Sequence, residues 1–170
     1  MVRILLEHGL DATMQNKNGA TSLHEASMAG HVDVARLLLE HGADATARQK
    51  GGWTPLHFAS APGHAEVVRL LLERGANATA QENDGWTPLH FASVLGHVEV
   101  ARLLLDRGAN ATAQANDRCT PLHIASTQGH AEVARLLLDR GANATARESK
   151  GRTPLHCAAA GTGQPRTPPS

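Results

Sequence analysis

A motif of four residues returns through this chain at a fixed spacing. Thr-Ser-Leu-His begins at Thr21, and Thr-Pro-Leu-His begins at Thr54, Thr87, Thr120 and Thr153, each start 33 residues after the one before. The segment after the motif is repeated as well, for example as GHAEVVRLLLERGANATA and GHVEVARLLLDRGANATA. A period of this length predicts an array of similar small units that bury their apolar side chains against one another.

Each unit carries the signals for two short helices. In the second complete unit, Thr54 is a good N-cap, and Pro55 suits the first helical position because its missing N–H costs nothing there. Gly63 can adopt the left-handed conformation that ends this helix, and a second helix is predicted at 65–74. Helices of about two to three turns are not stable alone in water, so their apolar faces must pack on the next pair. The side chains expected in that packing include Leu56, Val67, Leu71 and Leu72.

The 33-residue period and the Thr-Pro-Leu-His motif resemble the ankyrin-repeat family over nearly all of residues 1–160. The resemblance implies an all-α solenoid of stacked helix-turn-helix units with β-hairpin-like turns. Both ends carry incomplete repeats, which predicts a piece of a longer array or an array with trimmed ends. The predicted divisions are a partial repeat at 1–15, complete repeats at 16–48, 49–81, 82–114 and 115–147, a partial repeat at 148–160 and a disordered tail at 161–170.

Composition narrows the classes of partner. Lys and Arg together number 16, as do Asp and Glu, so the formal net charge is zero and nothing favours a nucleic-acid partner. No apolar run approaches the roughly 20 residues that cross a bilayer, and the first residues do not resemble a signal peptide, so no membrane partner is expected. The two cysteines suit a reducing compartment, which favours the cytoplasm or the nucleus.

Two neighbouring units differ in a way that favours a binding function. Units 49–81 and 82–114 are identical except at eight positions, and five of these lie at the tip of the extended turn or at the end of the first helix. In the ankyrin-repeat family these places line the concave, partner-binding face. The five are Gln49/Glu82, Lys50/Asn83, Gly51/Asp84, Ala61/Val94 and Pro62/Leu95. The alternative is simple drift at exposed positions.

The residue before each motif is Ala20, Trp53, Trp86, Cys119 or Arg152. Because close-packed cores resist such changes of volume, we predict that this position is not a core slot. The resemblance places it on the concave side, and Trp and Arg are enriched at interface hot spots. Alternatively, each indole covers its own turn and the neighbouring repeat. The predicted partner-binding residues are Trp53, Trp86, Val94, Leu95, Met28, Lys17, Arg48, Lys50, Gln81, Asp84, Asp117 and Gln128.

One position of the first helix is expected in the core. Phe58 and Phe91 occupy it, as do Ile124 and Cys157 in later units. The first complete unit has Glu25 there, which the sequence does not explain.

The chain contains eleven histidines, and all of them follow the repeat. Equivalent residues of adjacent repeats are expected about 8–10 Å apart, too far to share a metal ion. The resemblance implies that the motif histidines tie neighbouring backbones by hydrogen bonds. No histidine is left to activate a nucleophile, so we predict no catalytic residue, no metal and no cofactor. Three Asn-Ala-Thr sequons, the first at Asn77, are interpreted as turns after the second helix, where Asp44 stands in the first unit.

Arg118 replaces the turn glycine found at Gly52 and Gly85. Because a side chain is strained at positive φ, we expect higher mobility at 115–119 than at 82–86.

The sequence thus predicts a non-catalytic module that binds a protein or peptide through the concave face. The alternative is a substrate-docking or regulatory segment of a larger enzyme or receptor. We expect a monomer, with end-to-end self-association through apolar ends as a further alternative.

Overall fold

The structure is a computed structural model that describes residues 1–9 and 11–161. Within these residues it contains ten α-helices and no β-strand. The helices are α1 (Val2–Glu7), α2 (Ser22–Met28), α3 (Val32–Glu40), α4 (Pro55–Ser60), α5 (Ala65–Glu73), α6 (Pro88–Val94), α7 (Val98–Asp106), α8 (Pro121–Gln128), α9 (Ala131–Asp139) and α10 (Pro154–Ala160). The tail predicted at 161–170 lies outside the described residues beyond Gly161.

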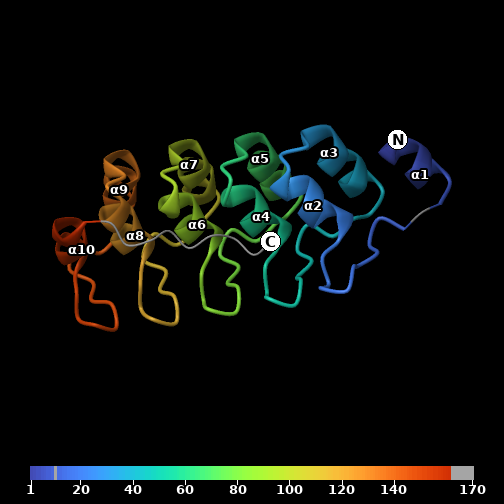
Figure 1. The fold of residues 1–170 in the computed structure, drawn as a ribbon. Helices are drawn as coiled ribbons and strands as arrows, with labels where there is room; N and C mark the ends of the chain where they lie inside the picture. Colours follow the sequence, from blue (N-terminus) through green and yellow to red (C-terminus); the bar gives the residue numbers. More distant parts are fainter. Residues whose placement is uncertain (10, 162–170) are drawn as a thin grey trace.

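The helices stack in two rows that run the length of the molecule (Figure 1). One row contains α3, α5, α7 and α9, and the other contains α2, α4, α6, α8 and α10. Each helix of the second row packs against the next one along it, as α2 does against α4 and α6 against α8. The segments that connect each second helix to the following first helix project on one side as a series of hairpin loops (Figure 1). We call these loops fingers; they lie within residues 11–21, 41–54, 74–87, 107–120 and 140–153. This is the all-α solenoid that the sequence predicts.

The first helix of each pair begins as the motif predicts. Thr54 precedes α4 with an extended backbone, and Pro55 takes the first helical position. The backbone N–H of Thr54 donates a hydrogen bond to Nδ1 of His57, 3.1 Å away, so the motif histidine satisfies a donor at the helix start. Gly63 follows α4 with a φ of 86°, the left-handed conformation that the sequence predicts.

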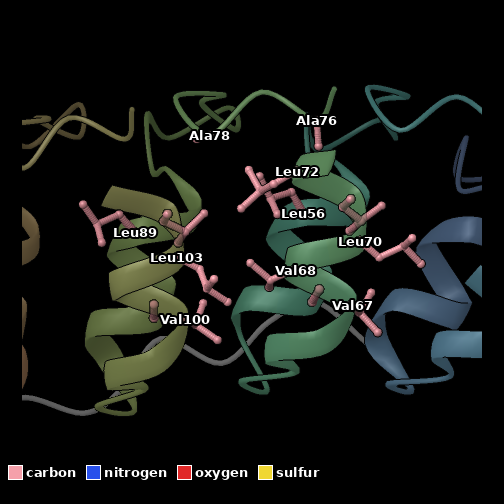
Figure 2. Packing of buried hydrophobic residues seen from close by; sticks show 14 of the residues in the cluster. Leu56, Val67, Val68, Leu70, Leu72, Ala76, Ala78, Leu89, Val100 and Leu103 are labelled. Carbon is pink, nitrogen blue, oxygen red and sulfur yellow. The ribbon is translucent and has the colours of Figure 1, made fainter. Parts of the chain in front are cut away.

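The main core lies between the two rows of helices. Leu56 of α4 and Val67 and Leu71 of α5 are fully buried, and Leu72 is 9% exposed, as predicted. Figure 2 shows the side chains of α5 and α7 pointing into the space between neighbouring repeats. Because neither helix of a pair could bury this surface alone, the stack itself stabilises each repeat.

The fingers are joined to one another by backbone hydrogen bonds. Within one finger, the N–H of Gln49 donates to the carbonyl oxygen of Trp53, 3.0 Å away. Between fingers, Lys50 N–H donates to the oxygen of Asn18 at 2.9 Å, and Asn83 N–H donates to that of Gly51 at 3.1 Å. Each finger therefore stands in a fixed register beside the next.

The Asn-Ala-Thr segments form the turn after the second helix. The side-chain oxygen of Asn77 accepts from the N–H and the hydroxyl of Thr79, at 2.9 and 2.8 Å. Asp44 accepts from Thr46 in the same way, at 2.7 Å in both contacts. Asn and Asp are interchangeable here because only an acceptor oxygen is needed. The interpretation of these sequons as turns is confirmed.

Candidate functional site

Fingers and first helices line a common surface. A hollow of about 360 Å³ is bounded by side chains of two neighbouring fingers and of helices α2 and α4. Its lining residues are Asn16, Asn18, Ala20, Glu25, Met28, Gln49, Lys50 and Phe58. A second hollow, of about 260 Å³, lies between later fingers and is lined by Asp84, Trp86, Asn116 and Asp117. A partner on this side would meet both kinds of element at once.

The two tryptophans are part of a buried cluster, which corrects the prediction that their position is not a core slot. Trp53 is 6% exposed and Trp86 is 8% exposed. The ring centroid of Trp53 lies 4.4 Å from that of Phe91 in the next repeat and 5.4 Å from that of Phe58 in its own. Trp86 lies 5.1 Å from Phe91. Trp53 thus fills the space between adjacent repeats, the alternative that the sequence left open. Trp86 packs on Phe91 of its own repeat, in a cluster that also contains Ile124 of the next.

The position before each motif accepts residues of very different volume because it opens to the surface on one side. A smaller side chain there alters the surface instead of creating a closed void. Ala20 in this slot leaves a hollow above Phe58, Cys119 is half-buried, and Arg152 extends into solvent. The rule that cores resist changes of volume applies to enclosed sites, and this site is not enclosed.

The other predicted binding residues divide by exposure. Val94 is 5% exposed and belongs to the buried cluster, whereas the neighbouring Leu95 is 52% exposed. Met28 and Gln128 are half-buried at the ends of α2 and α8. The predicted binding residues that lie on the fingers are all exposed: Lys17, Arg48, Lys50, Gln81, Asp84 and Asp117.

Two of these exposed side chains connect repeats. Nη2 of Arg48 donates to the carbonyl oxygen of Gln81, 2.6 Å away in the next repeat. Nε2 of Gln81 lies 3.3 Å from the carbonyl oxygen of Gln114, one repeat further on. Arg48 and Gln81 therefore stabilise the finger row, whatever else they contact.

Sequence reasoning did not assign Ala20, Glu25 or Phe58 to the binding residues. Phe58 was expected in the core, yet it is half-buried and lines the larger hollow. Phe91, at the same phase, is 3% exposed and was correctly placed in the core. The available signal was that Ala20 and Glu25 both stand where the next repeat has an aromatic residue.

Of the five motif histidines, four are buried and connect repeats, as the resemblance implies, whereas His156 in the last repeat is exposed: the buried ones are His24, His57, His90 and His123. Nε2 of His24 lies 3.2 Å from the carbonyl oxygen of Trp53, and Nε2 of His57 lies 3.2 Å from that of Trp86. A second set reaches back along the array, with Nε2 of His64 3.0 Å from the carbonyl oxygen of Met28. This backward set has no counterpart in the sequence predictions.

Burial lowers the pKa of His57 to about 3 and that of His90 to about 4, so both rings are neutral near pH 7. Across residues 1–9 and 11–161, no three His, Cys, Asp or Glu side chains are grouped so as to hold a metal ion. In the same residues, no helix has the length and apolar character needed to cross a bilayer.

Comparison with known families accounts for the architecture. A family model described as ankyrin repeats (3 copies) matches residues 46–115. A second, described as ankyrin repeats (many copies), matches residues 5–59 and 104–158. Among curated proteins, none matches the chain. The matches reach from the first helix to the last and include the residues on both sides of the larger hollow.

Proposed function

Because the chain belongs to the ankyrin-repeat family, whose repeats are generally protein–protein interaction modules, we propose that it binds a protein or peptide on the surface shared by its fingers and first helices. We call this surface the finger face. It consists of Lys17, Lys50, Asp84 and Asp117 on the fingers with Met28, Leu95 and Gln128 at the ends of first helices. The family is typically non-catalytic, and the module acts by binding alone.

The observation that carries this proposal is that fingers and first helices bound the same hollow. The repeated backbone bonds between fingers support it further, because they hold the contacting residues in a fixed register. A preorganised surface loses little conformational entropy on binding. Three of the side chains that differ between units 49–81 and 82–114, those of Asn83, Asp84 and Leu95, are exposed on this face, as a surface matched to one partner requires.

A matched pair of leucines tests the assignment. Leu95 on the finger face is 52% exposed, and Leu138 on the second helix α9 is 46% exposed. Proteins captured from a cell lysate should be lost with Leu95→Asp and kept with Leu138→Asp, because only the first places a charge in the contact. If Leu138→Asp abolishes capture and Leu95→Asp leaves it intact, partners bind the second-helix side and the proposal is wrong.

A docking or regulatory role within a larger enzyme or receptor would use the same finger face, so the leucine pair tests it as well. Self-association is favoured by a different observation. Ile4 and Leu5 of α1 are 54% and 43% exposed, and Leu155 of α10, at the other end of the stack, is 76% exposed. Light scattering over a range of concentrations separates this alternative from the monomer we expect.

A further inference from the structure

The larger hollow exists because the first complete repeat lacks two aromatic side chains. Before its motif it has Ala20, where the next repeat has Trp53. On its first helix it has Glu25, where the next repeat has Phe58. The space left between these substitutions is the hollow of about 360 Å³ beside α2 and α4. This volume is at the lower end of the roughly 300–1,000 Å³ typical of small-ligand pockets.

The next interface along the array shows what fills the equivalent place. There, Trp53 lies against Phe91, with ring centroids 4.4 Å apart, and Phe91 is only 3% exposed. One repeat earlier, an indole at position 20 would lie against Phe58 in the same way. Phe58 has no such cover from Ala20 and remains half-buried. The hollow is therefore the vacant counterpart of a tryptophan site that the molecule already builds elsewhere.

The lining of the hollow has a matching chemical character. Ala20, Met28 and Phe58 supply apolar surface, and the ring of Phe58 can pair with a second aromatic ring. Glu25 replaces the phenylalanine that contacts the indole in the next repeat, so a carboxylate stands next to the vacant ring position. It is exposed and forms no ion pair within the described part of the chain. Lys50, on the neighbouring finger, bounds the other side.

We propose that this hollow receives a tryptophan side chain of a bound peptide, with a lysine or arginine of that peptide adjacent to the tryptophan and facing Glu25. The inference rests on the proposed protein-binding function and specifies what its partner presents at one end of the finger face. The indole completes the stack on Phe58, and the cation neutralises the carboxylate beside it.

Methionine methyl NMR with N-acetyl-tryptophanamide as the probe tests the pocket directly. Met28 lines the hollow, whereas Met1 and Met14 are 87% and 66% exposed and act as internal controls. The probe should shift the Met28 methyl signal in a saturable manner and leave the other two unchanged. N-acetyl-leucinamide should bind about twofold to tenfold more weakly because it cannot pair with Phe58. Equal affinity of the two amides, or no saturable shift of Met28, overturns the proposal.

Two filled variants serve as matched controls. Ala20→Trp restores the residue found at positions 53 and 86, and should abolish the effect of the probe on Met28 while preserving the fold, as checked by circular dichroism. Glu25→Phe restores the other missing side chain and provides a second filled variant if Ala20→Trp does not fold. A probe that still binds a folded, filled variant with wild-type affinity occupies another site, and the proposal is then wrong.

The charge preference is tested with two blocked dipeptides, Trp-Lys and Trp-Glu. Wild type should bind Trp-Lys about twofold to fivefold more tightly, the range of a solvent-exposed ion pair. Glu25→Gln should remove the difference without weakening the tryptophanamide. A preference that survives Glu25→Gln overturns the assignment of this carboxylate. All of these outcomes are independent of Leu95→Asp, so a failed pocket and a failed finger face can be told apart.

Discussion

Nε2 of His57 lies 3.2 Å from the carbonyl oxygen of Trp86, 29 residues further along the chain. On the other side of the same ring, Nδ1 accepts a hydrogen bond from the N–H of Thr54 at 3.1 Å. These contacts fix the neutral tautomer, in which Nε2 donates and Nδ1 accepts. One side chain thus starts its own helix and holds the next finger, and a second proton on Nδ1 would abolish the contact with Thr54.

Stability should therefore decrease in mild acid. Burial lowers the pKa of His57 to about 3 and that of His90 to about 4, whereas an unfolded histidine titrates near pH 6.5. Between these values only the unfolded chain binds the proton, so the free energy of unfolding falls as the pH drops below about 6.5. The limiting slope is about 1.4 kcal/mol per pH unit for each of the two residues. Urea denaturation between about pH 7.5 and pH 5 measures it.

His57→Asn should lower stability near pH 7.5 and flatten this slope. His41→Gln is the control, because His41 is exposed on the turn after α3 and should leave the slope unchanged. Stability that is constant from about pH 7 to pH 5 would show that the buried rings accept protons without cost.

Replacing Trp53 should destabilise the array. Its indole is buried between Phe58 and Phe91, so Trp53→Ala removes a large apolar contact surface and uncovers both rings. The expected loss is about 3 kcal/mol in the free energy of unfolding, the lower end of the range for such substitutions because no closed cavity forms, and urea denaturation measures it. Leu95→Ala, at an exposed position, should change stability by no more than about 0.5 kcal/mol. A Trp53→Ala variant as stable as Leu95→Ala would place the indole outside the core.

The fold could be predicted because its determinants are local and repeated. Thr54, Pro55 and Gly63 specify where a first helix begins and ends, and the period repeats that specification down the chain. Burial of Leu56 and Leu71 follows, because short helices must cover one face to persist.

The site could be predicted only in part, because it depends on pairs of repeats. The space at position 20 is set by Glu25 of the same repeat and Phe58 of the next. The residues found at this position across the repeats predicted that it is not a core slot, and that prediction is wrong for the two tryptophans. Trp53 is buried because the neighbouring repeat supplies Phe91, a contact across repeats that a comparison of one position does not contain.

Replacing Arg118 by glycine should stabilise the finger that contains it. Arg118 has a φ of 63°, the only positive value for a residue other than glycine in the described part of the chain. A side chain in the left-handed region costs about 1–2 kcal/mol, and Arg118→Gly removes this strain. Glycine loses more conformational entropy on folding, which offsets part of the gain. The free energy of unfolding should therefore rise by about 1 kcal/mol. Thermal or urea denaturation measures the gain.

The converse change provides a control. Gly151 has a φ of 76° and open space where a Cβ would stand, so Gly151→Ala isolates the backbone strain and should destabilise by a similar amount. Hydrogen exchange at 115–119 should also be faster than at 82–86. Equal exchange rates, together with no gain from Arg118→Gly, would mean that the array absorbs the strained residue without loss.

Cys119 should react slowly while the protein is folded. Two causes raise the pKa of its thiol to about 12: burial, which has the larger effect, and the nearby negative charge of Asp117. An unfolded cysteine titrates near 8.5, so unfolding greatly increases the thiolate fraction near pH 8. The thiolate of lower pKa is the weaker nucleophile, which offsets part of this gain in rate.

In a Cys157→Ala background, which leaves one thiol, iodoacetamide should alkylate the folded protein about a hundredfold more slowly than the urea-unfolded chain. Asp117→Asn keeps the side-chain oxygen that accepts from the Cys119 N–H at 2.9 Å and removes the charge, so it should accelerate alkylation of the folded protein. Folded and unfolded rates that agree within a factor of about two would show that neither burial nor Asp117 protects the sulfur.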